Sequence, residues 1–226
     1  YDLELTPTQI KAMVAGRQRD VEIHAGNVLQ KVPQPESQKL IPRAPDFEPP
    51  LPLWNGSRSQ GPLVGHVSDD SAILWARVPV PGTYTLEVTD SGGANAKRSF
   101  HAVARESDDW CLRWEVSELK ANSTYHYRIA RAAEILWAGR DFTFKTAPKT
   151  DDTVEVTLAF GSCANFESSS IWTRIKTEGA DGVVLLGDTP YIDVTDLDRV
   201  HDAYRRFSSI PTLSATFRSI PFWGTW

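Results

Sequence analysis

The stretch GVVLLGDTPYID, residues 182–193, is the strongest indication of the fold class, because an uninterrupted aliphatic run ends at a glycine and polar side chains follow at once. A strand that is apolar at every position is typical of a sheet covered on both faces, usually a parallel sheet between helices. The preceding segment, SSSIWTRIKTEG (168–179), predicts a helix that ends at Gly179, with inward-facing Ile171, Trp172 and Ile175. The two segments together predict a crossover helix and a parallel strand of an α/β layer.

The segments on either side extend this layer. VEVTLAFGSC (154–163) predicts an earlier strand that ends at Gly161. After the strand at 182, Thr195 is the expected cap of a helix whose Leu197, Val200, Tyr204 and Phe207 recur at helical spacing. A shorter helix is expected around LSATFR (213–218), and SIPFWGTW (219–226) predicts a third strand. We assign residues 149–226 to this α/β part.

A different pattern occupies residues 55–148, where apolar and polar positions alternate. Short segments of this kind, separated by turn residues such as PVPG and DSGG, are typical of antiparallel strands in a β-sandwich. They are SAILWARV (71–78), TYTLEV (83–88), WCLRWEV (110–116), STYHYRI (123–129) and DFTFKT (141–146). Three tryptophans at strand positions, Trp75, Trp110 and Trp114, are expected in the core of the sandwich. The chain is thus predicted to be multidomain.

The first 54 residues precede the sandwich and have two features. Thr6 as cap, Pro7 at the first helical position and Gln9 three residues after the cap predict a short amphipathic helix. Residues 33–52 contain seven of the 15 prolines in the chain, a density that favours extended polyproline-type structure. We interpret residues 1–54 as this helix followed by a proline-rich linker or strap.

The overall charge argues against two classes of partner. With 24 basic and 29 acidic side chains the formal net charge is −5, so no overall positive field would attract nucleic acid or an anionic membrane. No apolar run approaches the ~20 residues of a membrane-spanning helix. We therefore expect neither a nucleic-acid-binding surface nor a transmembrane segment.

Candidate metal ligands stand where the first two predicted parallel strands end. In open α/β sheets, ligands bind beyond the carboxyl ends of the strands, and these ends carry Cys163 on one strand and Asp188 with Tyr191 on the other. A thiol and a phenol have reference pKa values of ~8.5 and ~10, so both need a strongly polarising partner to bind as anions. The group therefore favours a metal of high charge. Asn165 and Ser168, next to the following helix, are candidates for holding a phosphate group.

Three motifs carry a resemblance to a known family: FGSC (160–163), GDTPYID (187–193) and IPFWGTW (220–226). They lie behind ELKANSTYHYRI (118–129), which resembles the "tyrosine corner" of fibronectin type III-like sandwiches through Leu119 and Tyr125. In this order the chain resembles the PhoD-like alkaline phosphatases and phosphodiesterases of the calcineurin-like metallophosphatase superfamily.

The resemblance implies a function and a set of ligands. It implies a secreted, metal-dependent hydrolase of phosphate mono- or diesters, acting extracellularly, in the periplasm or at the cell envelope, through a metal-activated water or hydroxide. Cys163, Asp188 and Tyr191 would bind Fe3+, and Asp188 would also reach Ca2+ and act as the catalytic bridge. The family supplies further Asp and His ligands beyond its third strand, whereas this sequence stops at Trp226. We therefore expect residues 149–226 to be an incomplete metallophosphatase domain, with the C-terminal remainder of the enzyme as its partner.

Two alternatives stay open. Purple acid phosphatases also join a fibronectin-like domain to a metallophosphatase core and share the Gly-Asp-x-x-Tyr motif, but they have a D-x-G aspartate where this chain has Ser162-Cys163. The other alternative is a non-catalytic cell-surface binding module with a degenerate α/β appendage. It would predict no metal at Cys163 and Asp188, and no loss of function when Tyr191 is replaced by phenylalanine.

Overall fold

The computed structural model describes residues 56, 58–92, 97–164, 169–192 and 195–225. All of them fall in the second of two units into which the chain divides, Leu51–Trp226. The helix predicted after Thr6 and the proline-rich segment at 33–52 lie outside the described residues.

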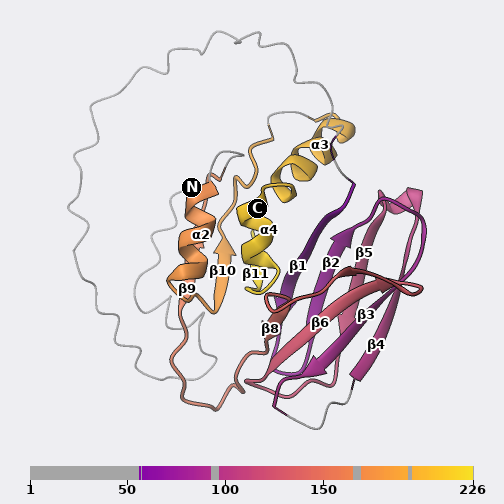
Figure 1. Cartoon of the computed structure of the whole chain (residues 1–226). Coiled ribbons are helices and arrows are strands. Elements are labelled where there is room, and N and C mark those ends of the chain that lie inside the picture. Colours follow the sequence, from indigo (N-terminus) through magenta and orange to yellow (C-terminus); the bar gives the residue numbers. More distant parts are fainter. Residues whose placement is uncertain (1–55, 57, 93–96, 165–168, 193–194, 226) are drawn as a thin grey trace, which may run out of the picture. The chain divides into compact units, whose positions relative to one another are not determined.

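Two antiparallel sheets form the sandwich (Figure 1). The first has the order β1-β2-β5, and the second has the order β4-β3-β6-β7, with β8 also paired to β6. The strands are β1 (Gln60–Val67), β2 (Ala72–Arg77), β3 (Gly82–Asp90), β4 (Lys97–Ala104), β5 (Cys111–Val116), β6 (Thr124–Arg131), β7 (Glu134–Trp137) and β8 (Thr143–Lys145); the 3-10 turn η1 (Glu106–Asp108) precedes β5. The predicted antiparallel strands are confirmed, and β1, β4 and β7 are additional to them.

The side chains between the two sheets follow the alternation of the sequence. On β5, Leu112, Trp114 and Val116 are buried while Arg113 and Glu115 are exposed, as an alternating strand requires. The predicted tyrosine corner is present, because the buried Tyr125 hydroxyl accepts a hydrogen bond of 2.8 Å from the Lys120 backbone N–H. This bond fixes the connection that leads into β6.

The three tryptophans predicted in the sandwich core lie in three different environments. Trp114 is in that core, 1% exposed. Trp75 lies on the opposite face of β2, where it packs against a second apolar cluster. Trp110 precedes β5 with a positive φ of 63°, and the Arg58 guanidinium lies 5.7 Å from its ring centroid. The prediction is therefore wrong for Trp75 and Trp110, since alternation does not tell which face of an outer sheet meets further layers.

A parallel sheet follows the sandwich in the chain, with the order β11-β10-β9 (Figure 1). Its strands are β9 (Leu158–Gly161), β10 (Gly182–Leu185) and β11 (Phe222–Gly224), and its helices are α2 (Ser169–Thr177), α3 (Leu197–Ser208) and α4 (Pro211–Phe217). Both neighbours of β10 run parallel to it. The parallel arrangement is the one that the sequence predicts.

One face of this sheet is covered by helices and the other is open. Val183 and Leu185 of β10 are buried with Trp172 of α2 and with Phe207 and Phe217 of the later helices. On β9, by contrast, Leu158 is 44% exposed and Phe160 is 64% exposed. Within the described residues, the expectation of a sheet covered on both faces is therefore met on one face only.

The helices depart from prediction at three positions. Asp196, rather than Thr195, caps α3, and its carboxylate accepts a 3.0 Å hydrogen bond from the Arg199 N–H. Ile171 and Leu197 were expected to face inward, but they are 47% and 65% exposed, whereas Trp172, next to Ile171, is buried. Among the described residues, no helix is long and apolar enough to cross a membrane.

The sandwich and the parallel sheet pack against each other through apolar and polar contacts. Leu63 of β1 belongs to the same apolar cluster as α3 and α4. The buried Tyr127 hydroxyl of β6 donates a 2.7 Å hydrogen bond to the Arg218 carbonyl at the end of α4. Burial raises the pKa of this phenol, so it remains a donor at all ordinary pH values. The sandwich thus holds the helices that follow the candidate site.

Candidate metal centre

Cys163 and Asp188 meet at the carboxyl ends of two adjacent parallel strands. Cys163 lies two residues beyond β9 and Asp188 three residues beyond β10. Gly161, at the end of β9, accepts a 2.7 Å bond from the Leu186 N–H, and the Cys163 N–H donates to the Gly187 carbonyl at 3.4 Å. These backbone bonds hold the two loops together. The Cys163 Sγ and the Asp188 Oδ2 are 3.9 Å apart.

The backbone at both residues has a conformation that side chains rarely adopt. Cys163 has φ 58° and Asp188 has φ 48°, both in the left-handed region, and Gly187 between the strand and the aspartate has φ 102°. Such positions cost on the order of 1–3 kcal/mol and gather at active sites and ligand-binding loops. Cys163 and Asp188 are thus two facing residues that both have left-handed backbone.

Both side chains are accessible. Cys163 is exposed, and so is Asp188. Free cysteine is among the most buried residue types, so an exposed thiol next to a carboxylate does not fit the interpretation of Cys163 as a small core residue. Cys111, by comparison, is half-buried and donates weakly to the Asp109 carbonyl at 3.7 Å.

The donor pair fits a single metal ion. A metal–sulfur bond is about 2.3 Å and a metal–oxygen bond about 2.0–2.2 Å, so two atoms that are 3.9 Å apart can both contact one cation. A thiolate and a carboxylate are both anionic, which suits an ion of high charge. Across the described ranges, no group of three or more His, Cys, Asp and Glu side chains is placed to hold a metal.

Of the other predicted site residues, the structure describes Tyr191 but not Asn165 and Ser168. Tyr191 lies three residues after Asp188 on the same loop and is 47% exposed, so it is not a ring packed into the core. Asn165 and Ser168 lie outside the described residues. The pair Cys163 and Asp188 is therefore the part of the predicted constellation that the structure brings together.

Known proteins resemble the chain in two ways. Residues 55–148 match the family model described as "PhoD-like phosphatase, N-terminal domain". The solved structure titled "Structure of PhoD" superposes with a TM-score of 0.65 at 23% identity, over 77% of this chain and 40% of that one. The chain thus spans less than half the length of that protein, and the likeness is one of fold.

A further solved structure, the FN5 domain of Drosophila Lar, gives a TM-score of 0.31 at 16% identity, over 40% of this chain and 96% of that one. A search of curated protein sequences found no match. The family model identifies the sandwich, and the superposition on PhoD agrees with it over a larger share of the chain. The chain therefore contains a PhoD-like N-terminal part, with its PhoD-like N-terminal domain at residues 55–148.

Proposed function

We propose that the chain is part of a metal-dependent phosphoesterase of the PhoD type, which hydrolyses phosphate mono- or diesters. The observation that carries the proposal is the 3.9 Å approach of the Cys163 sulfur to the Asp188 carboxylate, each on a left-handed backbone position at the end of a parallel strand. The match of residues 55–148 to the N-terminal domain of PhoD-like phosphatases supports the same assignment. Like the phosphatases it resembles, the enzyme would act outside the cytoplasm.

The chain's own residues would supply part of the metal coordination. Cys163 as thiolate, Asp188 as carboxylate and Tyr191 as phenolate would bind Fe3+, with Asp188 also reaching Ca2+. Bound there, the cations would polarise the phosphoryl oxygens and lower the pKa of a water molecule. The C-terminal remainder of the enzyme would supply further ligands, so the proposal concerns the complete protein.

The substrate would lie next to the metal ligands. Helix α2 begins at Ser169, six residues after Cys163, and the N–H groups of a first helical turn attract a phosphate. Asn165 and Ser168, just before this helix, would add side-chain contacts to the phosphoryl oxygens. The proposed role of this loop is to orient the ester for in-line attack.

The test compares variants of the full-length protein. Tyrosinate bound to Fe3+ gives a visible charge-transfer absorption, so the iron-loaded protein is expected to be coloured and Tyr191→Phe to lose the colour. Asp188→Asn and Cys163→Ser should lower the hydrolysis of p-nitrophenyl phosphate and of bis(p-nitrophenyl) phosphate by at least about 100-fold.

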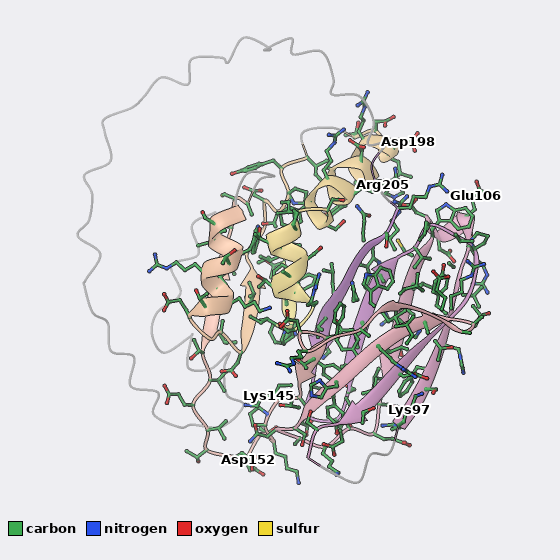
Figure 2. All side chains as sticks on the ribbon, in the orientation of Figure 1. Lys97, Glu106, Lys145, Asp152, Asp198 and Arg205 are labelled. Carbon is green, nitrogen blue, oxygen red and sulfur yellow. The ribbon has the colours of Figure 1, made fainter. Side chains whose placement is uncertain are left out.

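Matched controls separate the site from the fold. Cys111→Ser changes the other cysteine, and Asp198→Asn removes an exposed carboxylate from the first turn of α3 (Figure 2). Both should keep colour and activity. A colourless, inactive wild-type protein after loading with iron and calcium would favour the binding module. A coloured protein that loses nothing in Asp188→Asn would refute the assigned ligands.

A further inference from the structure

A cavity lies between the sandwich and helices α3 and α4, and it extends to Thr189, the residue after Asp188. Its volume is about 650 Å³, within the range of small-molecule sites. Its wall is largely apolar and includes Leu63, Trp75, Tyr204, Leu213, Phe217 and Phe222. An apolar space of this size gains little from water, because water needs polar partners. Its shape and lining suit the body of an apolar molecule.

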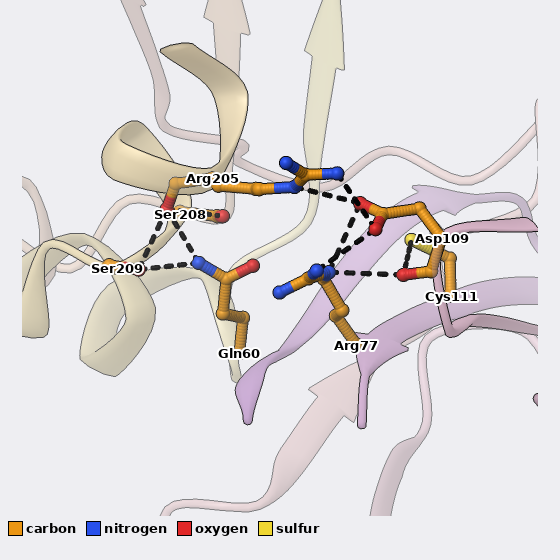
Figure 3. Close-up of polar contacts among 7 residues, drawn as sticks. All are labelled: Gln60, Arg77, Asp109, Cys111, Arg205, Ser208 and Ser209. Carbon is orange, nitrogen blue, oxygen red and sulfur yellow. Dashed lines mark hydrogen bonds and ion pairs between the residues drawn. The ribbon is translucent and has the colours of Figure 1, made fainter. Parts of the chain in front are cut away.

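One polar atom in the wall has no hydrogen-bond partner in the described part of the chain. Gln60 is 3% exposed, and its Nε2 donates to the Arg205 carbonyl at 2.6 Å and to the Ser209 Oγ at 2.5 Å. Because the nitrogen faces a carbonyl oxygen, the amide cannot be turned around. The Gln60 Oε1 accepts no hydrogen bond from any described residue, and Figure 3 shows this oxygen on the side away from Ser209. A buried acceptor of this kind costs about 1–3 kcal/mol unless a donor reaches it.

A charged cluster stands next to Gln60 in the same wall. The Asp109 carboxylate pairs with Arg77 at 2.9 Å and with Arg205 at 2.8 Å (Figure 3). One carboxylate is thus shared by two guanidinium groups. Cys111 lies beside them, and burial together with the nearby Asp109 charge raises the pKa of its thiol, which therefore stays neutral.

These groups select the kind of head group that a ligand can carry. A cation would be repelled by Arg77 and Arg205, whereas a carboxylate is attracted by these guanidinium groups but has no proton to donate to the Gln60 Oε1. A hydroxyl group has no charge, and it both donates and accepts a hydrogen bond. It can donate to the Gln60 Oε1 while accepting from a guanidinium N–H.

We propose that this cavity binds a neutral amphiphile, an aliphatic chain that ends in a hydroxyl group. The chain occupies the apolar space between Trp75 and Phe217, and the hydroxyl donates to the Gln60 Oε1. The proposed metal ligands Cys163, Asp188 and Tyr191 do not line this cavity, although Thr189, the neighbour of Asp188, does. The site therefore stands whether or not the protein hydrolyses phosphate esters.

The experiment uses three probes with the same chain: decan-1-ol, decanoate and decylamine. Binding is followed by calorimetry and by tryptophan fluorescence, to which Trp75 in the cavity wall contributes. Decan-1-ol is expected to bind at least about tenfold more tightly than the two charged probes, since each of these leaves a buried group facing a like charge or a wrong partner. Equal binding of all three, or tighter binding of decanoate, would overturn the assignment, as would no binding at all.

Variants locate the site. Gln60→Met removes the acceptor at nearly constant volume and should lower the affinity for decan-1-ol by about tenfold or more. Gly65→Val fills part of the cavity from β1, where a new Cβ would first meet the Ile73 carbonyl oxygen at 3.4 Å, an ordinary contact. This variant should lower the affinity for all three probes. It also tests the location of the site if Gln60→Met does not fold. Val103→Ala, at an exposed position of β4, is the control and should bind like the wild type. Unchanged binding in Gly65→Val would refute the location.

Discussion

Replacement of Asp109 by asparagine is expected to destabilise the protein by about 2–3 kcal/mol. The carboxylate accepts hydrogen bonds from Arg77 at 2.9 and 3.1 Å and from Arg205 at 2.9 Å. Charged hydrogen bonds contribute about 1.5–3 kcal/mol each, and loss of one partner of a buried pair costs about 3–5 kcal/mol. The Asp109 side chain is 28% exposed, so solvent screening lowers the expected loss of stability to about 2–3 kcal/mol.

The effect should depend on pH in a defined direction. Burial opposes ionisation of Asp109, but the hydrogen bonds from Arg77 and Arg205 outweigh it and hold the pKa of the carboxyl below its ordinary value. A lowered folded-state pKa stabilises the protein fully above the unfolded value of about 3.9, and the gain disappears as the pH falls through the folded value. Wild type and Asp109→Asn should therefore differ at pH 7 and converge at strongly acid pH.

Urea unfolding at a series of pH values measures this difference, and thermal unfolding should show a midpoint lower by about 4–12 °C at pH 7. Asp108→Asn is the control, because this neighbouring carboxylate lies 3.7 Å from Arg105 on an exposed surface, and the change should alter stability by less than about 0.5 kcal/mol. If Asp109→Asn matched the wild type within about 0.5 kcal/mol at pH 7, Asp109 would not hold α3 to the sandwich.

Three further substitutions test the packing by urea unfolding. Tyr127→Phe should cost about 1–2 kcal/mol, because it removes the 2.7 Å bond to the Arg218 carbonyl; no loss would mean that this bond does not form. Trp172→Ala should cost about 3–5 kcal/mol, since this ring of α2 is 2% exposed and packs against Phe207 and Phe217; a loss below about 1 kcal/mol would contradict this packing. Gly182→Ala should cost about 1–3 kcal/mol, because its Cβ would come within 2.6 Å of the Trp223 ring; an unchanged midpoint would show that the ring moves freely.

Local patterns in the sequence predict the elements well. Alternation locates strands such as β5, and the aliphatic run at 182–185 predicts a parallel strand, because both patterns report how many faces of a strand are buried. The polar residues that follow the ends of the two strands also predict that Cys163 and Asp188 lie close together, as they do. These features depend on residues close in sequence, or on the one rule that carboxyl ends of parallel strands share an edge.

Contacts between distant elements are not predicted in this way. Trp75 faces the helices rather than the sandwich core, because its strand belongs to a sheet packed on both sides, and a period of two gives no information about the second side. Asp109 joins partners 32 and 96 residues away, and Gln60 lines the cavity through a contact 145 residues distant. No spacing rule connects positions so far apart.

The exposed apolar edge strand of the parallel sheet favours self-association of the protein. In the described part of the chain, β9 is the outermost strand of that sheet, with Phe160 64% exposed beside Leu158. An uncovered apolar edge strand can pair with strands of other chains, and charged side chains or proline in edge strands usually prevent this pairing. The LAFG sequence of β9 has neither. Purified samples of this 226-residue chain should therefore self-associate as they are concentrated, and a lysine in place of Phe160 should keep them dispersed.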